Sequence, residues 1–126
     1  MKPFEGDLKE IAKDNEDFRR VLFTGEHAQL VVMSLGRDEE IGEEVHKVDQ
    51  VLYAVEGEGE AILDGKSRSF AKGDVVAVPA GLRHNFRNTD KDPLKLFTIY
   101  APPQHPAGTV HATKADALAG EAVAAR

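Results

Sequence analysis

Two parts of the chain carry side chains of types that bind divalent metals: Glu44, His46 and Gln50 in the first part, and His84 in the second. Residues two apart in a strand point to the same face, so Glu44 and His46 can project together into one cavity. Gln50 can join them after the chain bends into the next strand. An isolated histidine is more often a hydrogen-bonded filler than a ligand, so a metal site requires the fold to bring the two parts together.

The second part, residues 73–88, contains a short apolar strand, a tight turn and the start of another strand. Asp74 to Val78 is mostly apolar and β-branched, a composition typical of a half- or fully buried strand. Pro79 cannot donate to a sheet ladder, so the strand is expected to end there, and Gly81 can take the positive φ of a turn. The turn then delivers His84 to the start of the next strand.

This stretch resembles the second motif of the cupin family (the RmlC-like superfamily). Its spacing is Gly, five residues, Pro, one residue, Gly, two residues, His, three residues, Asn, and the chain matches every fixed position, namely Gly73, Pro79, Gly81, His84 and Asn88. A match at five fixed positions is a specific signal.

The first part is similar to the first cupin motif, which has two His separated by one residue, then Glu, then Gly. Anchored at Gly57, the Glu position falls on Gln50, the second His position on His46 and the first His position on Glu44. The motif's leading Gly falls on Asp38. The chain therefore departs from the motif at two of its three ligand positions.

The resemblance implies a remodelled metal site in which the ligands are Glu44, His46, Gln50 and His84. Carboxylate and amide oxygens are both acceptable metal donors. The family's usual three His and one Glu carry one negative charge, and so does this set. Two imidazoles with one carboxylate suit Fe(II), and Mn, Ni, Co, Cu and Zn stay open. A lost site is the alternative to a remodelled one.

Other polar residues near the motifs are assigned to structural roles first. Asp49 neighbours Gln50 and is expected to point away from the site, to the surface or behind the ligands. Tyr53 is expected to pack rather than contact a substrate. Arg83 could meet an anionic substrate at the rim or form a salt bridge with the acidic loop.

The remaining histidines are not expected to be ligands. His27 lies in a predicted turn and is expected to be exposed. His105 and His111 lie in the Pro-rich tail, residues 101–126, which is interpreted as a surface or lid segment. Its Ala-rich run from Thr113 to Ala125 could form a short helix capped by Thr113, or it could fray.

The elements that must position these residues are strands. A short helix is expected over Asp7 to Lys13 with Asp7 as its cap. Closely spaced apolar runs with turns between them then predict about nine strands in an antiparallel sandwich or barrel. The runs are Arg19–Thr24, Ala28–Leu35, Val45–Ala54, Glu60–Leu63, Lys66–Phe70, Asp74–Val78, a strand from about His84, and Leu94–Tyr100.

Composition narrows the function classes. The 126 residues fit one domain over 1–126, with a barrel core over about 18–100. A formal net charge of −6 without a basic patch argues against nucleic acid, and the absence of cysteine excludes thiolate ligands and disulfides. No apolar run approaches a membrane span or the core of a signal peptide, so we expect a cytoplasmic protein that does not bind membranes.

We therefore expect an all-β cupin barrel with a divalent transition metal in its mouth. The leading hypothesis is that the protein binds or acts on a small polar metabolite through the metal, possible activities being those of an isomerase or a dioxygenase. The alternatives are a non-catalytic metal- or ligand-binding module, and a metal-free barrel like the sugar isomerases and epimerases. The resemblance also implies a homodimer.

Overall fold

Nine strands and two helices make up residues 2–124, the part of the chain that the computed structural model describes. The predicted all-β fold is confirmed. The elements are α1 (Leu8–Asp14), β1 (Arg19–Thr24), β2 (Gln29–Leu35), β3 (Asp49–Glu56), β4 (Glu58–Leu63), β5 (Lys66–Ala71), β6 (Val75–Val78), β7 (His84–Asn88), β8 (Leu94–Ala101), β9 (Val110–His111) and α2 (Lys114–Ala124).

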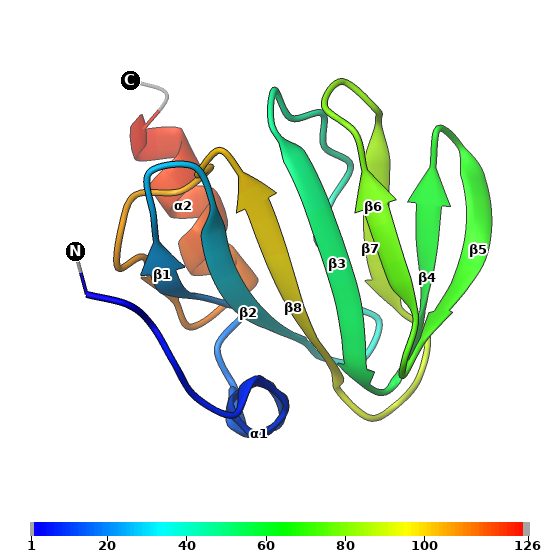
Figure 1. Ribbon diagram of the computed structural model, residues 1–126. Helices are drawn as coiled ribbons and strands as arrows, with labels where there is room; N and C mark the ends of the chain where they lie inside the picture. The colour runs from blue at the N-terminus through cyan, green and yellow to red at the C-terminus, as the bar shows by residue number, and fades with distance from the viewer. Residues whose placement is uncertain (1, 125–126) are drawn as a thin grey trace.

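The strands form two antiparallel sheets. The larger sheet has the order β6-β3-β8-β2-β1-β9, and the smaller has the order β5-β4-β7. In Figure 1 the smaller sheet lies beside β3 and β6, while α1 lies below β2 and β8 and α2 lies beside β1 and β2. An isolated bridge from Glu44 to His84 pairs the segment before β3 with β7.

Successive side chains of a strand point alternately to the two faces of its sheet, so in the larger sheet one set faces the barrel interior and the other faces outward. On β3, Leu52 and Ala54 belong to the main core together with residues of the smaller sheet such as Phe70 and Phe86. Val55 faces the other way and packs with Ala12 of α1 in a second apolar cluster. Helix α1 therefore covers the outside of the sheet and leaves the interior to the core and the candidate site.

Both helices begin with the expected caps. The Asp7 side chain accepts a hydrogen bond of 3.2 Å from the Glu10 backbone N–H. At α2, the Asp116 N–H donates to the Thr113 hydroxyl at 3.1 Å, and the Thr113 N–H donates to the Asp116 carboxylate at 3.3 Å. This reciprocal pair satisfies two backbone donors at the helix start. The predicted end of α2 at Ala125 lies outside the described residues.

Asn88, the last fixed residue of the second motif, has a structural role. Its side-chain amide donates to the carbonyl oxygens of Leu35, Gly36 and Asp92 at 2.9 to 3.0 Å, and its oxygen accepts from the Asp90 N–H at 2.8 Å. Asn88 is buried. These bonds tie the end of β7 to the end of β2 and to the loop before β8.

The first motif's glycine is explained by a close backbone approach. Gly57 has φ of 99°, and a Cβ added there would lie 2.7 Å from the Pro93 carbonyl oxygen. Only glycine fits that turn between β3 and β4. Asp38, which stands at the motif's leading glycine, also has a positive φ, 61°, a conformation that aspartate tolerates better than most residues.

One sequence prediction about the fold was wrong. The strand expected from Val45 begins only at Asp49, so His46 lies on an irregular segment rather than on a strand facing His84. Residues 101–121 of the tail are mostly exposed, as a surface or lid segment would be, but the tail is anchored to the barrel because β9 pairs with β1 and Ala117 of α2 is buried in the main core. Neither described helix combines the length and apolar character needed to cross a membrane.

Candidate metal centre

His84 is positioned by the turn between β6 and β7. Gly81 takes φ of 89° in this turn, and its N–H donates to the His46 carbonyl oxygen at 2.9 Å. The His84 Nδ1 lies 2.9 Å from the Leu82 carbonyl oxygen, which can only accept, so Nδ1 carries the proton. The neutral ring therefore presents an unprotonated Nε2, as a metal-binding histidine does.

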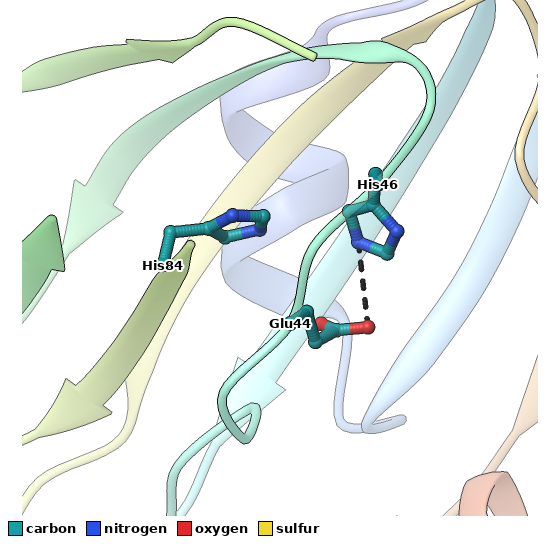
Figure 2. Close-up of side chains that lie close together, drawn as sticks. All are labelled: Glu44, His46 and His84. Carbon is teal, nitrogen blue, oxygen red and sulfur yellow. Dashed lines mark ion pairs between the residues drawn. The ribbon is translucent and has the colours of Figure 1, made fainter. Parts of the chain in front are cut away.

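Glu44 is held beside His84 by backbone pairing. Each residue donates its N–H to the other's carbonyl oxygen, at 2.8 and 3.0 Å. Two residues later His46 is buried, and its Nε2 lies 3.3 Å from the Glu44 Oε2. Figure 2 shows the three side chains converging, with the Glu44–His46 contact dashed. One ligand atom from each residue lies within 4.8 Å of those of the other two.

Gln50 lies on the adjoining wall of the barrel. It is buried on the inner face of β3, and its Nε2 donates to the Thr98 hydroxyl at 3.0 Å. Its register partner on β8 is Tyr100, whose ring lies edge-on to His46 with centroids 5.9 Å apart. The amide nitrogen is thus occupied by Thr98, which leaves the amide oxygen free.

Three buried donor atoms of this cluster have no hydrogen-bond partner among residues 2–124. They are the His46 Nε2, the Gln50 Oε1 and the His84 Nε2. The 3.3 Å contact between His46 and Glu44 counts as an ion pair, but its geometry is too poor for a hydrogen bond. Unsatisfied buried polar atoms are rare and cost free energy, so a group of three requires an explanation.

The electrostatics keep Glu44 ionised. Burial alone would raise the pKa of the Glu44 carboxyl, but the 3.3 Å ion-pair contact with His46 and the nearby Arg19 and His84 outweigh burial and lower it. The carboxylate is therefore the charged donor of the cluster at neutral pH.

Glu44 and His46 are spaced as two ligands of one metal ion would be. Two ligands that bind one ion at roughly 2.1 Å lie about 3.0 to 3.4 Å apart in octahedral or tetrahedral geometry. The 3.3 Å between Glu44 and His46 falls in this range. The bonds from the His84 Nδ1 to Leu82 and from the Gln50 Nε2 to Thr98 hold both side chains without using the His84 Nε2 or the Gln50 Oε1.

The structural roles assigned to four polar residues are confirmed. Asp49 points away and accepts a hydrogen bond of 2.9 Å from the Ala80 N–H. Tyr53 stacks on Phe97 on the outer face of the sheet, with centroids 5.1 Å apart. Of the two alternatives for Arg83, the structure has the salt bridge, at 3.0 Å to Glu43 of the acidic loop. His27 is exposed.

His105 is half-buried, which fits the lid alternative for the tail better than an exposed surface segment. Its ring packs edge-on against Tyr100 with centroids 5.1 Å apart, and its Nε2 is buried without a hydrogen-bond partner in the described chain. Burial first, and then the nearby charge of Arg19, lower the pKa of His105 to about 4. His111 lies in β9 with its Nδ1 3.4 Å from the Arg19 guanidinium.

Two residues of this region were missed by the sequence analysis. Arg19 is 2% exposed and lies in β1 on the same face as buried Val21, and that parity was a signal that could have identified it. Gln29 is buried at the start of β2 and binds the backbone of His105 with both side-chain atoms, at 2.7 and 2.9 Å. Nothing local in the sequence indicates this contact with the tail.

A cleft of about 490 Å³ opens beside Glu44. Its walls come from β1, the segment before β3, the tail and α2. The lining residues are Arg19, Glu44, Gln104, His105, Pro106, Thr109, His111, Gly120 and Glu121. The tail and α2 therefore form one side of the approach to the candidate metal centre.

The antiparallel double sheet and the histidine cluster at its mouth define a cupin-type barrel, and the chain belongs to the cupin family. The family model described as "Cupin domain" matches residues 31–100. That range includes all four sequence-predicted ligands and leaves out Arg19 and the tail.

Relatives extend the similarity to nearly the whole chain. The uncharacterised protein YrkC of Bacillus subtilis is 48% identical over 128 residues, covering 95% of this chain and 68% of that protein. The crystal structure of BH2720 from Bacillus halodurans aligns with a TM-score of 0.92 at 43% identity, covering 94% of this chain and 95% of that one. TT1209 from Thermus thermophilus aligns with a TM-score of 0.69 at 30% identity, over 78% and 96% of the two chains.

Proposed function

We propose that the protein binds one divalent transition metal in the mouth of its barrel, through Glu44, His46, Gln50 and His84, and uses it to bind a small polar metabolite. The observation that carries the proposal is the set of three buried, unpartnered donor atoms beside the Glu44 carboxylate. A bound metal would satisfy all three atoms and offset the cost of burying them.

The donor set favours borderline metals such as Fe(II), Mn(II), Ni(II) or Zn(II). It offers two imidazole nitrogens, one carboxylate oxygen and one amide oxygen, and its single negative charge comes from Glu44. A metal with four protein ligands and an open position would act as a Lewis acid toward an oxygen of the metabolite. The cleft beside Glu44 is the route by which the metabolite would reach that position.

The protein's own residues prepare the site for this role. The Leu82 carbonyl holds His84 in the metal-binding tautomer, and Thr98 leaves the Gln50 oxygen free. The charge of Glu44 is maintained by its contact with His46. These features support metal-dependent ligand binding over a metal-free isomerase-like barrel, which would have no need of three unpartnered donors.

Isothermal titration of the metal-free protein with Mn(II), Ni(II), Zn(II) and, under anaerobic conditions, Fe(II) tests the proposal. We expect one ion per chain for at least one of these metals. His46→Ala and His84→Ala each remove a nitrogen donor and should abolish tight binding, and Glu44→Gln should weaken it strongly. His27→Ala is the matched control, because His27 is exposed and far from the motif in sequence.

Binding should also fade as the pH falls through about 6, because both imidazoles must be neutral to bind the ion. If the wild-type protein and His84→Ala bind every ion equally weakly, the metal proposal fails and the metal-free alternative takes its place.

A further inference from the structure

Arg19 is a buried cation that forms no salt bridge within residues 2–124, although its charge acts on the Glu44 carboxylate across the cleft. The residue is 2% exposed, and its Nε has no hydrogen-bond partner among residues 2–124. It takes part in none of the salt bridges within that range. Its guanidinium lies over the Phe18 ring at 5.3 Å. A buried charge is expensive unless it is paired and hydrogen-bonded, so this guanidinium requires a counter-ion.

The surroundings of Arg19 suit an anion from outside the chain. Arg19 lines the 490 Å³ cleft together with His105 and His111. The His105 Nε2 is a second buried atom of this cleft without a partner in the described residues. The His111 Nδ1 accepts one hydrogen bond from the guanidinium, at 3.4 Å. The unpartnered Nε of the guanidinium and the His105 ring can both serve a ligand in the cleft.

We propose that this cleft binds a small organic monoanion, whose carboxylate is held by Arg19 while its other polar end faces the metal centre at Glu44. The guanidinium fork matches a carboxylate bidentately. Only the part of the proposal that concerns the metal end rests on the proposed function, because Arg19 and its unpartnered Nε are independent of the metal.

The charges of the cleft favour a monoanion over a phosphate dianion. Its lining has one arginine, Arg19, against two carboxylates, Glu44 and Glu121. A doubly charged ligand would meet more repulsion than this single cation offsets, whereas a carboxylate matches its charge. A divalent ion at Glu44 would change the net charge of the cleft from negative to positive. Metal and anion should therefore strengthen each other's binding, and by the same factor.

Calorimetric titration with lactate and with lactamide, its neutral analogue of the same shape, tests the proposal. The protein is used both loaded with one equivalent of Zn(II) and stripped on a chelating resin, since a soluble carboxylate chelator would compete for the cleft. Lactate should bind at least about tenfold tighter than lactamide, the difference of about 1.4 kcal/mol expected for one charge-assisted contact. It should bind more tightly with Zn(II) than without.

Variants of two neighbouring arginines assign the effect. Arg19→Met keeps a long apolar stem and should reduce the affinity for lactate to that for lactamide. Arg19→Lys should keep part of the difference in affinity between lactate and lactamide, because it keeps the charge but loses the bidentate geometry of the guanidinium. Arg20→Met is the matched control, since Arg20 is exposed on the opposite face of β1, and it should bind lactate as the wild type does.

The outcomes separate the two proposals. Equal binding of lactate and lactamide by the wild type, or unchanged lactate binding by a folded Arg19→Met variant, would overturn the anion site. Zn(II) content measured in the same samples reports on the metal site, and Arg19→Met should not lower it. A lactate preference that persists without metal and disappears in Arg19→Met supports the anion site even if the metal proposal fails.

Discussion

At the scale of single residues, the site depends on which atoms are already used and which are left free. The His84 Nδ1 hydrogen-bonds to the Leu82 carbonyl oxygen, and the Gln50 Nε2 donates to the Thr98 hydroxyl. Both therefore present one buried, unpartnered atom. Glu44 supplies the charge, and its position is fixed by backbone pairing with His84. Each donor is thus positioned by a partner that does not compete for the metal.

Gln50→Glu would place a carboxylate where the family motif has one. We expect metal affinity to rise by about tenfold or more, because a second charged ligand is added. The metal-free variant should be less stable, because Glu44 and the new carboxylate repel each other in a buried site. Titration calorimetry and thermal unfolding measure the two effects. Ser69→Glu, which adds the same charge at an exposed position of β5, is the control and should leave metal affinity unchanged.

His105→Gln should make the metal-free protein less sensitive to acid. The folded-state pKa of His105 is lowered to about 4, first by burial and then by the charges of Arg19, His46 and His111, with Glu44 acting in the opposite direction. Between the ordinary value near 6.5 and about 4, the unfolded chain binds a proton that the folded protein does not. The free energy of unfolding therefore falls as the pH falls through this window.

Urea unfolding at about pH 7.5 and about pH 5 measures this difference. The loss of stability on acidification should be smaller for His105→Gln than for the wild type. His27→Gln, at an exposed histidine, should behave as the wild type does. An equal loss in His105→Gln and the wild type would show that His105 titrates normally in the folded protein.

At the scale of elements, the tail packs against the barrel and forms one wall of the cleft beside the site. Strand β9 extends the larger sheet beyond β1, and α2 buries Ala117 in the main core. Gln29 of β2 holds the tail's backbone at Gln104 and His105 through three hydrogen bonds of 2.7 to 3.1 Å. These contacts set the position of the His105 ring against Tyr100.

Gln29→Ala should release this part of the tail. It leaves buried backbone groups at Gln104 and His105 without partners, so we expect a loss of about 2 kcal/mol or more in the free energy of unfolding. Hydrogen exchange at the amides of residues 104 and 105 should accelerate as well. Gln104→Ala, with its exposed side chain, should cost less than about 0.5 kcal/mol. Similar values for the two variants would contradict the assigned role of Gln29.

The positions of β1 to β8 along the chain could largely be predicted from the sequence, because apolar runs and turn residues are local signals. The irregular path over residues 45–48 could not, because Val45–Ala54 has the composition of one strand. The even residues Glu44, His46 and Gln50 nevertheless face inward, so the prediction that they share a cavity is compatible with the structure. Arg19 and His105 are brought together only by the docking of the tail, which no local pattern encodes.

At the scale of the whole molecule, the candidate site joins the two sheets. Gln50 comes from the larger sheet and His84 from the smaller, and Glu44 and His46 come from the segment between β2 and β3 that bridges to β7. A metal bound by all four would therefore cross-link the barrel at its mouth. The expected homodimer stays a prediction.

Metal should consequently stabilise the whole fold. At a free metal concentration of about 100 times Kd, the linkage contributes roughly 2.7 kcal/mol, which corresponds to a rise of roughly 10 °C in Tm for a chain of this size. Removing the ion should reverse the rise. Differential scanning calorimetry of the wild type and His84→Ala measures it, and the variant should show no shift. A rise of the same size in His84→Ala would indicate a different binding site.

The most direct test of the central claim is a crystal structure of the protein soaked with Mn(II) or Zn(II), with diffraction data collected at the absorption edge of the metal. We predict one strong anomalous peak per chain, within bonding distance of the His46 Nε2, the His84 Nε2, the Gln50 Oε1 and a carboxylate oxygen of Glu44. The absence of a peak at saturating metal, or a peak that contacts neither His46 nor His84, would contradict the account.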